Sequence, residues 1–351
     1  MRQALRGGPA LQGGGLALAA AVLFGISTPL VQHFGTQLGA FSTAALLYAG
    51  AAVLGAWLRQ PVEREARLQR QDAGRLLIMA LVGAVVGPVA LAWGLQHTSG
   101  TSAALMLSLE ALFTAVLAWR LYHESMDRRV LTAMLLLLAG GACLVLDQGR
   151  AGSPSGWGLL AVALATAAWG LDNTLSRALA ERDPAQVVLV KSALGASGSG
   201  LIALWLAEPL PTWTAALSLL LVGALGYGLS LRLYLLAQRA FGAARTGSVF
   251  AFAPFIGAAL AIGMGDRAWG QLMLLGSGLM LIGVVLHLAE SHAHEHQHEA
   301  LTHQHAHRHD DGHHNHAHHP MPTGPHSHEH THLPVQHRHP HVPDVHHSHQ
   351  H

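Results

Sequence analysis

The stretch Ser99–Trp119, SGTSAALMLSLEALFTAVLAW, decides the fold of this chain. It contains a single charged residue, Glu110, near its middle. At about 1.5 Å per residue, a helix of this length crosses the roughly 30 Å hydrocarbon core of a bilayer. A carboxylate at that depth costs roughly 2.5 kcal/mol or more, so we expect Glu110 to face a cavity or a partner rather than lipid. Two roles are open for it: a place in a transport path, or a protonated carboxyl group hydrogen-bonded to neighbouring helices.

The composition describes a membrane protein with a separate tail. The chain has 351 residues, of which 51% are hydrophobic and 11% charged, whereas soluble proteins are about 25% charged. Nearly all apolar residues precede residue 291, and residues 291–351 hold most of the histidines. The formal net charge of +1 gives no reason to expect a nucleic-acid partner. The single cysteine, Cys143, excludes an intramolecular disulfide and a thiolate metal cage.

Hydropathy predicts ten membrane-spanning helices and therefore an all-α membrane protein. Arg2 and Arg6 precede the first apolar run, as in the basic region of a signal peptide. That run is long enough to span and further spans follow, so we expect an uncleaved signal anchor. The expected spans lie at about residues 14–34, 38–58, 76–96, 99–119, 130–147, 156–177, 185–206, 214–236, 246–264 and 268–288.

Arginine counts predict the orientation of the chain, because cytoplasmic loops of membrane proteins carry an excess of basic residues. With a cytoplasmic N-terminus, fourteen arginines fall on the cytoplasmic side and only Arg150 and Arg267 fall outside. Ten spans return the chain to the cytoplasm, so we expect a multi-pass protein of the inner (plasma) membrane with both termini cytoplasmic. The fourteen are Arg2, Arg6, Arg59, Arg64, Arg67, Arg70, Arg75, Arg120, Arg128, Arg129, Arg177, Arg182, Arg239 and Arg245.

The two halves of the chain repeat at an offset of about 143 residues. That offset aligns Glu110-Ala111 with Ala253-Pro254, and Phe24-Gly25 in the first span resembles Trp169-Gly170 in the sixth. Five spans per half is an odd number, so the halves must be inverted relative to each other, as in transporters whose site lies near the midplane. The expected regions are a cytoplasmic N-terminus (1–13), a first five-helix repeat (14–147), a linker (148–155), a second five-helix repeat (156–288) and a disordered histidine-rich tail (289–351).

These motifs resemble those of the drug/metabolite transporter superfamily, in its ten-helix EamA-type branch. Members carry an aromatic-Gly pair in helices 1 and 6, a Glu-Pro pair in helices 4 and 9, and an acidic residue about fourteen positions later. Here the first half keeps the acid at Glu110 and again at Glu124, while the second half keeps Pro254 and has Asp266 one residue early. The resemblance implies secondary transport, usually export, of amino acids, sugars or other metabolites. Some similar members are linked to nickel and cobalt resistance.

Polar residues inside the spans are the candidate pathway groups: Glu110, Asp172, Asn173, His33 and Lys191. Lys191 either extends its amine to the cytoplasmic surface or forms an ion pair with Asp172. His33 either joins the pathway or lies at the membrane interface. Carboxylate and imidazole groups together suit nickel, cobalt or zinc, and the same carboxylates could carry a coupling proton.

The tail is dominated by a His-x-His pattern, with 24 of the 28 histidines after Ser291. Its apolar content is too low for a core, so we expect disorder. Neutral imidazoles bind borderline metals, with an affinity that falls below about pH 6. An expression tag and a low-complexity or pH-responsive tail are the alternatives. The candidate metal ligands are His292, His294, His296, His298, His303, His305, His307, His309, His313, His314, His316, His318, His319, His326, His328, His330 and His332.

The leading hypothesis is a proton-coupled exporter of divalent metal cations, chiefly nickel and cobalt, with a metal-gathering tail. The alternative is an exporter of an amino acid or another small metabolite, with the tail as an independent metal buffer. Lys191 and Arg232 favour this alternative, because cations suit a carboxylate-bearing solute. A non-transporting metal-storage or sensor protein is a third hypothesis.

No nucleophile elbow, P-loop or zinc-protease motif is present, so the chain is expected to be a transporter and not an enzyme. We expect no resident cofactor; nickel, cobalt or zinc would be substrate or tail ligand. The expected partners are the lipid bilayer and divalent metal ions, and no nucleic acid is expected. A second copy of the chain, forming a homodimer, is a further alternative.

Overall fold

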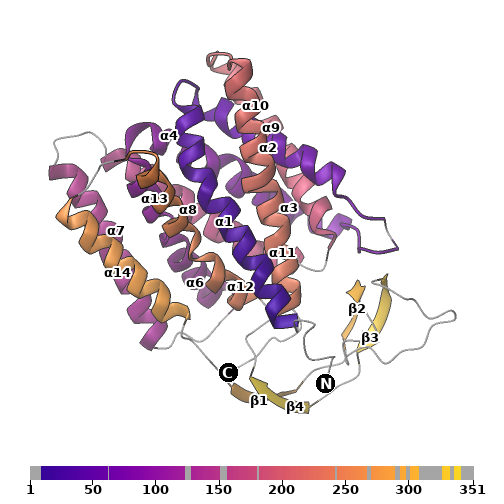
Figure 1. Cartoon of the computed structure of the whole chain (residues 1–351). Helices are drawn as coiled ribbons and strands as arrows, with labels where there is room; N and C mark the ends of the chain where they lie inside the picture. The colour runs from indigo at the N-terminus through magenta and orange to yellow at the C-terminus, as the bar shows by residue number, and fades with distance from the viewer. Residues whose placement is uncertain are drawn as a thin grey trace, which may run out of the picture.

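The computed structural model is a bundle of helices with four short strands beside it (Figure 1). The residues that it describes are 9–61, 63–122, 128–150, 156–179, 182–241, 243–266, 270–288, 293–297, 301–307, 326–332 and 336–340.

Each half of the chain folds into the same succession of helices. The first half contains α1 (Pro9–Gly35), α2 (Ala40–Trp57), η1 (Arg70–Asp72), α3 (Ala73–Leu81), η2 (Val82–Val86), α4 (Gly87–His97), α5 (Gly100–Met106), α6 (Leu109–Tyr122) and α7 (Arg128–Arg150). The second contains α8 (Gly156–Ser176), η3 (Arg177–Leu179), α9 (Pro184–Trp205), α10 (Trp213–Val222), η4 (Gly223–Leu229), α11 (Ser230–Phe241), α12 (Ala243–Phe250), α13 (Ala253–Gly263) and α14 (Gln271–Leu288).

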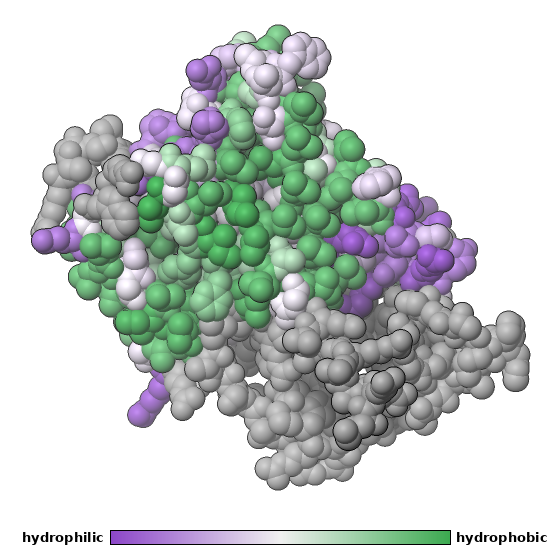
Figure 2. Space-filling view, viewed as in Figure 1, coloured by the Kyte–Doolittle hydropathy of each residue, from purple (hydrophilic) through white to green (hydrophobic). Residues whose placement is uncertain are grey.

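The described helices confirm the predicted spans. Seven helical runs are long and apolar enough to cross a membrane, and three shorter apolar helices bring the total to the ten expected segments. Hydrophobic residues cover most of the visible face of the helical body (Figure 2). Trp57 at one end of the bundle and Trp205 and Trp213 at the other are more than four-fifths exposed. Tryptophans in such positions are typical of the two membrane–water interfaces.

Two predicted spans are not continuous helices. The span predicted at 99–119 is divided between α5 and α6, and the span predicted at 246–264 is divided between α12 and α13. In the second case Pro254 follows the break, because proline lacks the N–H that would continue the helix and is favoured in a first turn. The third and eighth spans each contain a π-helical turn, η2 and η4. These irregular segments lie at matching places in the two halves.

The contacts between helices follow a two-fold relation between the two halves of the chain. Two contacts join equivalent elements, α2 with α9 and α7 with α14, and a third joins the two divided spans, where α5 packs on α13. The remaining contacts come in matched pairs, since α1 packs on α11 and α13 as α8 packs on α4 and α6. The pair α7 and α14 lies side by side at one edge of the bundle (Figure 1). The fold is therefore two inverted five-helix repeats.

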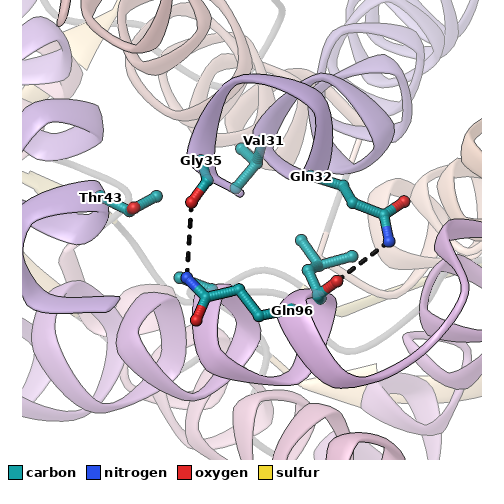
Figure 3. A pocket seen from close by; sticks show the side chains of 7 residues that line it. Val31, Gln32, Gly35, Thr43 and Gln96 are labelled. Atoms are coloured by element: carbon teal, nitrogen blue, oxygen red, sulfur yellow. Dashed lines mark hydrogen bonds between the residues drawn. The ribbon is translucent and has the colours of Figure 1, made fainter. Parts of the chain in front are cut away.

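Two glutamines connect the first and third spans at the end of the bundle where α1 ends and α2 begins, here called the α1–α2 end. Gln32 Nε2 donates to Leu95 O at 3.0 Å. Gln96 Nε2 donates to Gly35 O at 3.4 Å and to Leu38 O at 2.8 Å. Each side chain thus satisfies carbonyls at the C-terminal end of the other helix, across a narrow crevice (Figure 3).

Ion pairs join the two halves at the opposite end, where α8 ends and α9 begins, here called the α8–α9 end. Arg239 Nη1 lies 2.9 Å from Glu65 Oε1, and Arg182 Nε lies 2.9 Å from Asp72 Oδ2. Asp183 N donates to Ala66 O at 2.7 Å. In both ion pairs the acid belongs to the first half and the arginine to the second.

Four segments of the tail are extended and paired, whereas the composition predicts disorder. β1 (Ala293–Gln297) pairs antiparallel with β4 (Gln336–Pro340), and β2 (Leu301–His307) pairs antiparallel with β3 (His326–His332). Backbone pairing of this kind needs no apolar core, so the low apolar content did not indicate it. The candidate ligands His292, His298, His309, His313, His314, His316, His318 and His319 lie outside the described residues, as does Glu124.

Candidate functional site

A cavity lies between the two repeats, roughly halfway along the spans. Its volume is about 50 Å³, which is room for a few water molecules in this conformation, since one water needs about 10–15 Å³. Both halves contribute to its lining, which consists of Phe24, Tyr48, Glu110, Trp169, Asp172, Asn173, Lys191, Gly226, Tyr227, Ser230, Leu231, Tyr234 and Phe250.

Glu110 enters this cavity from the break between α5 and α6. Because α6 begins at Leu109, Glu110 lies in the first turn of that helix. The unpaired N–H groups and the dipole of a helix N-terminus favour a negative group there. Asn173 Nδ2 on α8 donates to Glu110 Oε1 at 2.5 Å, which joins the two repeats through their polar side chains.

Asp172 and Lys191 form a buried ion pair beside it. Lys191 Nζ contacts Asp172 Oδ2, and the two side chains are 2% and 4% exposed, respectively. Of the two alternatives for Lys191, the structure therefore shows the ion pair and not an amine extended to the membrane surface. The second carboxylate oxygen of this lining residue, Asp172 Oδ1, is buried and has no hydrogen-bond partner among the described residues.

The π-helical turn η2 packs against the Asp172 carboxylate of this ion pair. Gly83 O accepts hydrogen bonds from Tyr48 OH at 2.5 Å and from Trp169 Nε1 at 2.9 Å. A Cβ atom at Gly83 would lie 2.4 Å from Asp172 Cγ, so only glycine allows the carboxylate to approach the turn this closely. The glycine and its carbonyl therefore help to position both the carboxylate and two of the aromatic rings.

Aromatic rings form most of the remaining wall. The ring centroid of Phe24 lies 5.5 Å from that of Trp169, 5.8 Å from that of Tyr227 and 5.4 Å from that of Phe250. Tyr234 packs edge-on against Phe250 at 5.0 Å. Three of the chain's four tyrosines line the cavity. The sequence motifs indicate Phe24 and Trp169 but not the tyrosines or Phe250. A tyrosine in the middle of an apolar span needs a hydrogen-bond partner and is a signal that could have found Tyr48, Tyr227 and Tyr234.

The structure brings together four of the five predicted pathway residues, Glu110, Asp172, Asn173 and Lys191. It does not bring His33 to them. His33 lies about two and a half turns beyond Phe24 along α1, is exposed, and packs against the neighbouring Phe34. The length of α1 therefore separates His33 from the membrane acids, and of its two alternatives the structure favours a place near the membrane interface.

No cluster of three or more His, Cys, Asp or Glu side chains that could hold a metal ion occurs in the part of the chain that the structure describes. In the tail, the backbone register places His303 opposite His330, and His305 opposite His328. The other described candidate ligands also lie in paired strands: His294, His296, His307, His326 and His332.

Comparison with known proteins agrees with this architecture. The profile of the EamA-like transporter family matches residues 11–146 and 156–289, one match for each repeat. An "uncharacterized transporter" of Methanothermobacter thermautotrophicus is 27% identical over 291 residues, which cover 77% of this chain and 84% of that protein. A crystal structure of a protein with 19% sequence identity superposes with a TM-score of 0.58, covering 79% of this chain and 97% of that one. The chain therefore belongs to the EamA-like transporter family and is a multi-pass membrane transporter.

Proposed function

We propose that the chain is a secondary transporter that exports a small organic solute through the cavity between its repeats. One observation carries the proposal: a mid-membrane cavity in which acidic, amide and amine side chains meet a wall of aromatic rings. Polar groups inside a membrane are costly and are usually kept for a substrate or ion pathway. Apolar walls with a few convergent polar groups are the common form of a site for an organic molecule.

The same geometry favours an organic solute over a metal ion as the substrate of the helical body. Metal sites need several oxygen, nitrogen or sulfur ligands around one point. Glu110 and Asp172 are already bonded to Asn173 and Lys191, respectively. Aromatic rings contribute no ligand to a metal but supply contact area for an organic group.

A divalent-metal exporter, chiefly for nickel and cobalt, is the second candidate. The observation that favours it is the tail, where 24 histidines follow Ser291. A tail on the cytoplasmic side would raise the local concentration of metal at the entrance to the transporter. In the first proposal the tail is an independent metal buffer.

We further propose that the chain lies in the inner membrane with both termini in the cytoplasm. The support is the arginine distribution, fourteen residues against two. Fusion of a reporter after the last residue tests this. A cytoplasmic fluorescent protein should be bright there, and alkaline phosphatase, which needs an oxidising compartment, should be inactive. The reverse result would contradict the orientation.

The function is tested by measuring efflux from cells of a sensitive host that express one of four forms. These are the full chain, a chain ending at Glu290, Glu110→Gln, and the matched control Asp266→Asn, whose carboxylate lies at the α1–α2 end and accepts from Thr101 N at 2.9 Å. Loaded substrates should include amino acids, organic amines and the divalent ions of nickel and cobalt.

The first proposal expects organic efflux from all forms except Glu110→Gln. If the full chain and the shortened chain instead lower cellular nickel or cobalt while Glu110→Gln does not, the second candidate is correct. If Glu110→Gln exports as well as the full chain at equal expression, the site assignment fails.

A further inference from the structure

Glu110 is an unbalanced carboxylate in the cavity. The other acidic and basic side chains of the lining, Asp172 and Lys191, are paired with each other. Asn173 donates one hydrogen bond to Glu110 but carries no charge. Among the described residues, no ion pair is formed by Glu110. A buried carboxylate without a cation is costly, so this group must either hold a proton or face a cation.

A second carboxylate oxygen, on another residue of the lining, also lacks a hydrogen-bond donor. Asp172 Oδ1 is buried and has no hydrogen-bond partner among the described residues, and the whole side chain is only 4% exposed, so bulk water does not satisfy this oxygen. Ionised carboxylates are acceptors only, so a group that satisfies this oxygen must bring an N–H or O–H. An ammonium group has three N–H donors and a positive charge. It can therefore balance the charge of Glu110 and donate a hydrogen bond to Asp172 Oδ1.

The aromatic wall suits the same group. Phe24, Trp169 and Tyr227 lie with ring centroids 5.5–6.3 Å apart. The faces of such rings attract an organic cation and also accept its apolar part. A small hydrated inorganic ion gains neither of these contacts without losing its water.

The ion pair of Lys191 restricts the chemical class of the solute further. A carboxylate on the solute would need a free cation in the cavity, but Lys191 is buried and bonded to Asp172. Binding a carboxylate there would break this ion pair and leave Asp172 without its cation. The cavity in this conformation therefore favours an amine without a carboxylate over an amino acid.

From these four observations we propose that the cavity binds a monovalent organic ammonium ion, which replaces a proton held by Glu110 in the empty cavity. This inference rests on the proposed function and names its substrate class. The exchange balances: as the ammonium ion arrives, Glu110 releases one proton, and the charge of the site is unchanged. One proton carried inward per amine carried outward gives electroneutral export.

The experiment compares three probes that share a phenyl ring and differ in charge. They are 2-phenylethylamine, which is a cation, phenylalanine, which is a zwitterion, and 3-phenylpropionate, which is an anion; nickel chloride is the fourth probe. Binding to the purified full chain is measured calorimetrically in two buffers with different ionisation enthalpies, which reports the number of protons released. We expect the amine to bind at least tenfold more tightly than the other two organic probes and to release about one proton.

Variants distinguish a loss of ligand binding at the cavity from a loss of folding. Glu110→Gln should lose at least tenfold in amine affinity and should release no proton, and Asp172→Asn should weaken binding while proton release from Glu110 remains. Asp266→Asn, the control, should behave as the unmodified chain. Thermal unfolding of each variant shows whether it is folded.

The outcomes keep the two proposals apart. Tighter binding of phenylalanine or 3-phenylpropionate, or amine binding without proton release, overturns the ammonium inference and leaves the organic-solute transporter standing. Absence of amine binding to a folded chain also overturns it. If nickel binding depends on Glu110 and no organic probe binds, the proposed function fails as well.

Discussion

At the scale of single residues, the ion pair of Asp172 and Lys191 is the feature most sensitive to substitution. Lys191→Met would leave Asp172 as a buried charge without its cation, at a cost of about 3–5 kcal/mol. The double variant Asp172→Leu/Lys191→Met removes both charges and should recover most of that loss. Thermal unfolding in detergent measures both. Equal loss of stability in the single and double variants would show that the pair contributes through packing and not charge.

A second residue-scale prediction concerns Gly83. In Gly83→Ala the new methyl group would overlap the Asp172 carboxylate, and overpacking of this kind costs about 1–3 kcal/mol. Gly74→Ala is the matched control, because a Cβ atom there meets nothing within 4 Å. The control should leave the unfolding temperature unchanged or raise it, since alanine favours helix. A Gly83→Ala protein as stable as the control would contradict the close packing of η2 against Asp172.

At the scale of helices, the reciprocal glutamine bonds at the α1–α2 end hold α1 against α4. Gln96→Ala would remove this donor from the carbonyls of Gly35 and Leu38, at a cost of about 0.5–1.5 kcal/mol. Gln71→Ala is the control, because the Gln71 side chain is exposed and bonds only to its neighbour Gln69. Urea or heat unfolding compares the two. A loss confined to Gln71→Ala, or equal losses, would contradict this role.

The helix breaks show where prediction from the sequence stopped. Hydropathy located the fourth and ninth spans but could not divide them, because a break leaves the average hydropathy of a window unchanged. Pro254 marks the break before α13. No proline marks the break before α6, and this break places Glu110 at a helix N-terminus.

At the scale of the whole molecule, the ion pairs at the α8–α9 end join one repeat to the other. A double-mutant cycle with Glu65→Gln and Arg239→Gln should give a favourable coupling energy of about 0.5–3 kcal/mol, since both side chains are mostly buried and Arg239 Nη1 contacts both carboxylate oxygens at 2.9 Å. The coupling should weaken in high salt. A coupling of zero would mean that this contact does not hold the repeats together.

The tail should be separable from the helical body. A chain ending at Glu290 lacks 24 histidines and should lose nearly all of its capacity for Ni²⁺. The full chain should lose it below about pH 6, because protonated imidazoles do not bind metal. Calorimetric titration with Ni²⁺ at pH 7.5 and pH 5.5 checks both. Full metal capacity in the shortened chain would place the metal site in the helical body instead.

The all-α class, the ten spans and the two repeats could all be predicted from the amino-acid sequence. These follow from hydropathy over about twenty residues and from a periodic offset, which are properties of the chain before it folds. The contacts between polar groups became known from the folded chain alone: Asn173 bonds to Glu110, 63 residues away, and Lys191 pairs with Asp172. The tertiary structure also excluded His33 and added Tyr227 and Phe250 to the cavity. A side chain's partners depend on how the helices cross and on where they break. Local hydropathy carries no information about either of these features.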